Sequence, residues 1–237
     1  SPMSLAAADG RAFFVAGSEV ICVDGKTGNE VWSSPTGGGS GSAAKDSKTR
    51  KKKPKPASSG SKRGAGQGVG TVVVTDGVVL WSDGKKLTAL SAASGKALWS
   101  SSSKAGFRSP GDVFVVKGLV WTSPFAEGRD LKTGRVRKTN TGVKEIWTAG
   151  HHHRCYREKA TDRYLLTSYR GIEFIDLVGK EHTRNNWVRG VCQYGIMPCN
   201  GLIYAPSHAC GCFMEAKLYG FWAVAPERKA SPPPTAP

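Results

Sequence analysis

The sequence predicts an all-β protein built as a β-propeller of four-stranded antiparallel blades. Three observations lead to this fold: short runs of β-branched residues, frequent glycine turns, and a strand–turn–strand–tryptophan pattern that recurs along the chain. The chain has 237 residues, including 30 glycines and 13 prolines, and carries a net charge of +16. No apolar run approaches the ~18 residues of a membrane helix. The composition also excludes a coiled coil and a wholly disordered chain.

The repeat is clearest in residues 12–32 and 71–99. Each segment contains an apolar strand, a glycine turn, a second strand, a Thr-Gly or Ser-Gly turn, and an apolar residue followed by tryptophan. Looser copies follow at 113–136, 164–177 and 201–223, so about five blade equivalents are visible.

The turn glycines Gly28, Gly95 and Gly134 are 67 and 39 residues apart. Removing an insertion of about 30 residues brings the first interval near the ~40 residues of one four-stranded blade. Because a blade buries its faces only against its neighbours, we expect Trp32 and Trp99 to seal the gaps between adjacent blades.

The predicted domain organisation is one propeller segment, 1–226, interrupted at 36–69 by a disordered insertion rich in glycine, serine and lysine, with 227–237 as a proline-rich linker. Between Lys45 and Arg63 the insertion holds nine basic residues and one acidic residue, half of the net charge. Such a segment could form a patch for a polyanion, or it could only improve solubility. The residues of the patch would be Lys48, Arg50, Lys51, Lys52, Lys53 and Lys55.

Residues 24–32 and 94–99 resemble the tryptophan-bearing repeat of pyrroloquinoline-quinone-like β-propellers. That family includes quinoprotein alcohol dehydrogenases and a non-catalytic propeller lipoprotein of outer-membrane assembly. Residues 153–161, 187–192 and 200–206 resemble large propeller proteins of planctomycete-type bacteria, and the resemblance covers most of 10–225 outside the insertion. It implies a piece of a larger ring, commonly eight-bladed, with further blades from the missing part of the chain. It also implies a periplasmic or extracellular location, with the signal peptide outside this fragment.

The resemblance does not extend to a quinone site. Catalytic members place the quinone against a disulfide between adjacent cysteines, above a calcium ion held by carboxylates and an amide. The closest spacing here is Cys210-Gly211-Cys212, and no Asp or Glu matches the base or calcium position. We therefore assign no catalytic and no cofactor-binding residue.

Histidines and cysteines gather towards the end of the sequence. Five of the six cysteines lie in the last 83 residues, whereas Cys22 lies in an apolar strand and is expected to be a buried hydrophobic residue. Alternate residues of a strand share a face, so His151-x-His153-x-Cys155 and His208-x-Cys210-x-Cys212 each direct three ligand-type groups one way.

Three interpretations of this cluster stay open. The cysteines could form structural disulfides, as in many extracytoplasmic proteins, and this is the interpretation the sequence favours, with the connectivity undecided. The candidates are Cys155, Cys192, Cys199, Cys210 and Cys212. A zinc or copper site is the second interpretation. Its ligands would be His151, His153, Cys155, His208, Cys210 and Cys212. The third is a solvated polar surface.

The expected function is an extracytoplasmic binding or scaffold module that holds a protein or polysaccharide ligand at the pole bearing the cluster. One alternative is a quinone- or metal-dependent oxidoreductase that uses the cluster. Another is adhesion to an anionic polymer through the basic insertion. Basic residues of the second half, among them Arg157 and Lys159, could bind an anionic ligand or pair with acidic side chains. No nucleophile elbow and no carboxylate pair for glycosidase chemistry occurs.

Overall fold

The computed structural model describes residues 4–36, 70–105, 111–147, 155–207, 211 and 218–227. Residues 37–69 of the predicted insertion and 228–237 of the predicted tail lie outside this part of the chain. Thr36, the residue after the last strand of the first sheet, is still held to that sheet, because its amide and hydroxyl both donate to the carbonyl of Ser18 at 2.7 Å. None of the described helices has the length and apolarity to cross a membrane.

The described strands form five antiparallel sheets in chain order, joined as meanders. The first sheet comprises β1 (Leu5–Ala8), β2 (Arg11–Ala16), β3 (Glu19–Asp24) and β4 (Glu30–Pro35). The second comprises β5 (Thr71–Thr75), β6 (Val78–Ser82), β7 (Lys86–Ser91) and β8 (Ala97–Ser102). The third comprises β9 (Val113–Val116), β10 (Leu119–Thr122), β11 (Glu127–Asp130) and β12 (Val136–Thr139). The fourth comprises β13 (Lys159–Ala160), β14 (Tyr164–Thr167), β15 (Ile172–Asp176) and β16 (Thr183–Asn185), and a short helix, α1 (Gly142–Ile146), precedes it.

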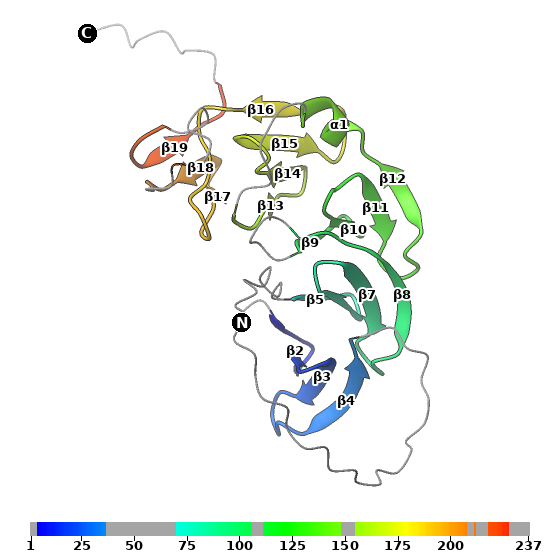
Figure 1. Ribbon diagram of the computed structural model, residues 1–237. Coiled ribbons are helices and arrows are strands. Elements are labelled where there is room, and N and C mark those ends of the chain that lie inside the picture. Colours follow the sequence, from blue (N-terminus) through cyan, green and yellow to red (C-terminus); the bar gives the residue numbers. More distant parts are fainter. Residues whose placement is uncertain are drawn as a thin grey trace, which may run out of the picture.

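The fifth sheet differs from the expected four strands. In the described residues it has three: β17 (Met197–Cys199), β18 (Leu202–Ala205) and β19 (Trp222–Val224). Figure 1 shows the five sheets following one another along an arc, with the first strands β5, β9 and β13 on the inner side and the fourth strands β4, β8 and β12 on the outer side. This is the radial arrangement of propeller blades, so the predicted fold class is confirmed.

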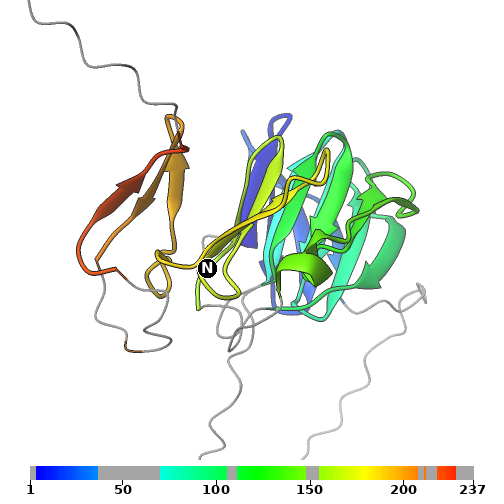
Figure 2. The same ribbon diagram turned by 90° about the horizontal axis from the view of Figure 1, so that it is seen from above.

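The hydrophobic core lies between successive sheets, as stacking of repeats requires. Phe13 and Val20 of the first sheet pack against Val79 and Leu90 of the second. Similar clusters join the second sheet to the third, the third and α1 to the fourth, and the fourth to the fifth. Figure 2 shows the same stacking from above, with the fifth sheet set apart from the other four.

The two repeat tryptophans seal adjacent blades, as predicted. The indole Nε1 of Trp32 in β4 donates to the carbonyl of Ala92, in the β7–β8 turn of the second sheet, at 3.0 Å. Trp99 in β8 repeats this contact one blade later, donating to the carbonyl of Leu131 at 2.8 Å. Each ring covers a turn glycine so closely that a Cβ on Gly95 or Gly134 would lie 2.6 Å from the indole. Glycine is required there both by this approach and by the positive φ of each turn.

A lysine replaces tryptophan at the next junction. Lys138 in β12 pairs with Gly128, just as Trp99 pairs with Ala89, and its ammonium donates to the carbonyls of Leu177 and Val178 in the fourth sheet. Leu177 follows Asp176 as Leu131 follows Asp130, so lysine and tryptophan donate to equivalent carbonyls. The sequence comparison of blades did not foresee this exchange.

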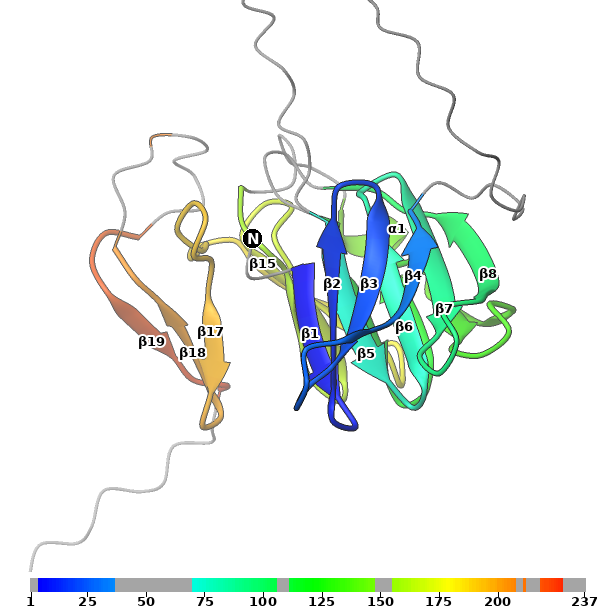
Figure 3. The same cartoon turned by 90° about the horizontal axis from the view of Figure 1, so that it is seen from below.

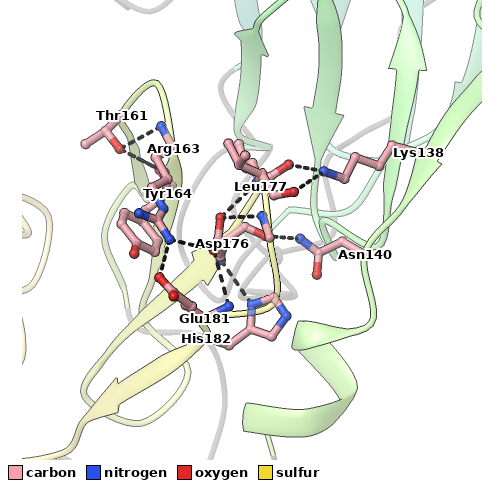
Figure 4. A network of polar contacts seen from close by, with 11 residues as sticks. Lys138, Asn140, Thr161, Arg163, Tyr164, Asp176, Leu177, Glu181 and His182 are labelled. Carbon is pink, nitrogen blue, oxygen red and sulfur yellow. Dashed lines mark hydrogen bonds and ion pairs between the residues drawn. The ribbon is translucent and has the colours of Figure 1, made fainter.

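Asp176 organises the turn that receives Lys138 (Figure 4). Its carboxylate accepts hydrogen bonds from the amides of Val178, Gly179 and Glu181 and from the guanidinium of Arg163. Burial acts to raise the pKa of Asp176, but the bonds from Gly179, Arg163 and the other donors outweigh it and hold the pKa well below its usual range.

Candidate functional site

The sheet topology places the strand ends nearest to the candidate segments at one end of the molecule. We call this the crossover end: the end where β2 turns into β3 at Gly17 and Ser18, and where the chain passes from each sheet to the next. Figure 3 shows the β2–β3 turn at this end and the β1–β2 turn at the opposite end. The strand ends nearest to residues 37–69, 148–154 and 208–217 lie at the crossover end: these are the ends of β4, β12 and β18 and the starts of β5, β13 and β19.

Most predicted site residues fall outside the described part of the chain. These are His151, His153, His208, Cys210 and Cys212 of the metal set, and Lys48, Arg50, Lys51, Lys52, Lys53 and Lys55 of the basic patch. Among the described residues, no group of three metal-ligating side chains occurs. The metal and polyanion sites therefore stay predictions.

Four cysteines are described, and no disulfide joins any two of them. Cys155 and Cys192 are partly buried and Cys199 is exposed. Cys22 is fully buried in the first core cluster, as expected, and burial raises the pKa of its thiol.

A cavity opens on the inner side of the arc, near the crossover end. Its volume is about 370 Å³, and the first strands of three successive sheets contribute to it. The apolar part of its wall comes from β5 and β9, and the polar part comes from Thr71 of β5, from residues just before and at β13, and from Gln193, which follows the fourth sheet. The lining residues are Thr71, Val72, Val73, Val113, Phe114, Arg157, Glu158, Lys159 and Gln193. An apolar wall with a few convergent polar groups is the usual character of a ligand-binding cavity.

An ion pair fixes the polar wall. Arg157 Nε donates to Asp112 Oδ1 at 2.8 Å, and Arg157 Nη1 donates to the hydroxyl of Thr71 at 3.1 Å. The amide of Glu158 donates to the other oxygen of Asp112 at 3.1 Å. These bonds join the second, third and fourth sheets, so the wall is assembled by tertiary structure.

The Asp112 side chain is only 6% exposed and that of Arg157 17%. Burial raises the pKa of Asp112, and the Arg157 guanidinium beside it offsets part of that effect. The Arg157 guanidinium is therefore largely engaged by the carboxylate of Asp112. The neighbouring Lys159 makes no ion pair in the described part of the chain.

Tyr156 packs against the turn that carries Gln193 of the cavity wall. Its hydroxyl accepts a hydrogen bond from the amide of Gly190 at 3.1 Å. A Cβ on Gly190 would lie 2.7 Å from the tyrosine ring, and a Cβ on Gly195 would lie 2.8 Å from it. Glycine at both positions therefore lets the 190–195 turn pack directly against Tyr156. Burial, together with the nearby carboxylate of Glu158, raises the pKa of Tyr156, which stays protonated.

A second buried carboxylate shapes the loop between β14 and β15. Glu173 is 1% exposed and accepts hydrogen bonds from the amides of Tyr169, Arg170 and Gly171. The loop presents Tyr169, which stacks on Trp147 with ring centroids 5.1 Å apart. An acidic residue inside the apolar run 172–175 was a sequence signal for this buried role.

Sequence reasoning named Arg157 and Lys159 only as members of a general basic set, and it missed Asp112 and Gln193. Asp112 lies 45 residues before Arg157, and Gln193 lies in a turn with no repeat signature. Nothing local in the sequence relates these residues to each other.

Comparison with known proteins identifies the family. A family model described as outer membrane protein assembly factor BamB matches residues 16–142, more than half of the chain. The chain belongs to this family of PQQ-like repeat propellers. A search of curated proteins gave no match for this propeller.

Solved structures show the same fold at low identity. The computationally designed Ika8 protein aligns with a TM-score of 0.52 and 12% identity over 93% of this propeller and 57% of its own chain. BamB from Moraxella catarrhalis aligns with a TM-score of 0.48 and 12% identity over 86% of this propeller and 53% of its own chain. Quinohemoprotein alcohol dehydrogenase from Comamonas testosteroni aligns at 0.46 and 15% identity, over 94% and 43%. This PQQ-like propeller thus spans about half the length of these three proteins.

Proposed function

We propose that this chain is an extracytoplasmic scaffold module that binds a segment of a partner protein at the crossover end. The inner cavity carries the proposal, because it combines an apolar wall with a few polar groups held by a buried ion pair. A cavity whose walls are fixed before binding loses little conformational entropy when a ligand enters. The family description, an outer membrane assembly factor, supports a protein partner and a location outside the cytoplasm.

The cavity sets the chemistry of the proposed segment. Val72, Val73 and Phe114 would contact an apolar side chain. The Lys159 ammonium and the side-chain amide of Gln193 would donate hydrogen bonds to carbonyl or carboxylate oxygens of the bound peptide. A cavity of about 370 Å³ suits two or three residues of an extended peptide.

The fifth sheet supports the expectation of further blades. Besides having three strands, it exposes large apolar side chains in and around them, including Met197 at 57%, Phe221 at 65% and Trp222 at 38%. In the first three sheets, the exposed apolar side chains of this size are single residues, mostly of the outer strands, such as Val31 and Leu98, while the cores between the sheets are covered by the next blade. We therefore propose that a further blade covers this surface in the complete ring.

A selection from random 12-residue peptides displayed on phage would test the binding function. Peptides enriched on the wild-type protein are titrated into three variants by calorimetry. Lys159→Met removes one donor, and Gln193→Trp narrows the cavity at an exposed residue. Val31→Ser, on the outer strand β4, is the matched control. Binding at least about tenfold weaker to both cavity variants and unchanged in the control supports the proposal. Enriched peptides that bind all variants equally, or no enrichment at all, would contradict it.

A further inference from the structure

Two cysteines distant in sequence meet beside the cavity. Cys155 precedes the fourth sheet and Cys192 follows it. The carbonyl oxygen of Cys155 accepts a hydrogen bond from the amide of Gln193, the residue after Cys192, at 2.6 Å. A peptide bond joins that amide to Cys192, so the two cysteine backbones are separated by one hydrogen bond.

The position of Cys192 is fixed by its own turn. Val191 and Gly195 form a reciprocal bridge, with N–O distances of 3.2 and 2.7 Å, and Cys192 is the first residue of the three between them. The same turn is held at Gly190 by the hydroxyl of Tyr156, the residue after Cys155. Contacts on both sides of Cys192, and contacts of Cys155 and the following Tyr156, therefore hold the two segments together.

This geometry fits a disulfide. With ordinary bond lengths, a carbonyl–amide contact of this kind places the Cα atoms of Cys155 and Cys192 about 5–7 Å apart. Disulfides span Cα separations of about 4.4–6.8 Å. Both side chains are partly exposed, so a thiol reagent can reach them, whereas Cys22 is buried.

The fourth sheet also lacks the contact that locks earlier blades. Trp32 and Trp99 pair with Cys22 and Ala89, and each donates to the next sheet. Lys138 does the same from the third sheet. At the equivalent position of the fourth sheet, opposite Phe174, stands Thr183, which is exposed and makes no such contact to the described strands of the fifth sheet. A covalent link between the segments before and after the fourth sheet would replace this side-chain hydrogen bond to the next blade.

We propose that Cys155 and Cys192 form a disulfide that closes the fourth blade and fixes the polar wall of the cavity. The two thiols lose two protons and two electrons as the S–S bond forms. The oxidant is a disulfide of a small thiol or a protein, which is reduced to two thiols by exchange. The proposal selects one pairing among the cysteine candidates, and it stands whether or not the cavity binds a peptide.

Peptide mapping under controlled redox conditions tests the pairing. The full chain is equilibrated with oxidised glutathione, free thiols are alkylated under denaturing conditions, and the protein is digested with trypsin and chymotrypsin. Cleavage after Arg189 and Tyr194 isolates Cys192 from Cys199. We expect a fragment containing Cys155 joined to residues 190–194, two hydrogens lighter than the separate thiol peptides, which disappears on reduction.

Three variants make the test specific. Cys155→Ser and Cys192→Ser should each abolish the linked fragment, whereas Cys199→Ser, at an exposed cysteine of β17, should keep it. A link from Cys155 to a fragment carrying Cys199, Cys210 or Cys212 would overturn the proposal. So would complete alkylation of both cysteines after oxidation, or a stoichiometric zinc ion that protects Cys155. Because the readout is mass alone, it is independent of the peptide titrations that test the binding function.

Discussion

Trp32 and Trp99 each dock on a turn of the next blade. This contact predicts that the same glycine-to-alanine substitution lowers the free energy of unfolding by different amounts in different blades. Gly28 and Gly134 occupy equivalent turns, with φ values of 73° and 70°. A Cβ on Gly28 meets nothing within 4 Å, whereas a Cβ on Gly134 would lie 2.6 Å from the Trp99 ring. Gly28→Ala therefore reports the backbone strain alone, and Gly134→Ala reports the strain and the displaced indole.

The magnitudes follow from these two contributions. An alanine in the left-handed region costs about 1–2 kcal/mol, so Gly28→Ala should lower the free energy of unfolding by that amount. Moving the Trp99 ring breaks its 2.8 Å bond to the Leu131 carbonyl, worth about 1 kcal/mol, and loosens its packing by about 1–2 kcal/mol. Gly134→Ala should then cost about 2–3 kcal/mol more than Gly28→Ala.

Urea unfolding followed by far-ultraviolet circular dichroism measures the difference without relying on tryptophan fluorescence. The decisive comparison adds Trp99→Ala. Once the ring is absent, Gly134→Ala should cost no more than Gly28→Ala, so the double variant should be more stable than the sum of the single effects implies. Equal losses for the two glycine variants, or strictly additive effects at Trp99 and Gly134, would refute the docking contact as the cause.

Three further predictions concern charge and the proposed disulfide. Asp176→Asn should lower the free energy of unfolding by about 2–4 kcal/mol at pH 7, because the backbone donors lose their charged acceptor. Since folding depresses the pKa of Asp176, wild type loses this stabilisation as the pH falls below about 4. The difference in unfolding free energy between variant and wild type, measured by urea titration, should therefore narrow there. Arg157→Met leaves Asp112 buried and unpaired, and should lower the free energy of unfolding by about 3–5 kcal/mol at pH 7.5. The loss should be smaller at pH 4.5 in the same assay, because burial raises the pKa of Asp112 and protonation removes its charge. An equal loss at both pH values would contradict this prediction. Reduction of the proposed disulfide should lower the unfolding free energy by about 3–4 kcal/mol, measured with and without reductant, and a serine variant of either partner should show no redox dependence.

Much of the fold could be predicted from local sequence. The repeat of strand, Ser/Thr-Gly turn and tryptophan in 12–32 and 71–99 indicates both the four-stranded unit and its stacking, because the same residues that end a strand also dock on the next blade. The looser copies at 113–136 and 164–177 coincide with strands, whereas in the fifth copy the second strand begins only at Trp222, and the exchange of tryptophan for Lys138 was not foreseen. A lysine and an indole share only one N–H donor to a carbonyl, and that equivalence appears only when the receiving turn is known.

The candidate site depended far more on tertiary structure. Composition and spacing identified the cysteines and the basic residues, since those signals are carried by residue type alone. They could not join Arg157 to Asp112, because an ion pair between two blades has no sequence period. They could not choose Cys192 as the neighbour of Cys155 either, because that choice depends on a five-residue turn packed on Tyr156.

The sequence by itself determined the class of fold, the repeat unit, the tryptophan locks and the burial of Cys22, because each follows from local periodicity and turn chemistry. Only the tertiary structure decided which strands line the inner cavity, which carboxylate engages Arg157, and which cysteines meet. The physical reason is that repeats fix contacts between neighbouring strands, whereas the cavity is assembled from the first strands of separate blades, whose approach depends on how all the sheets stack.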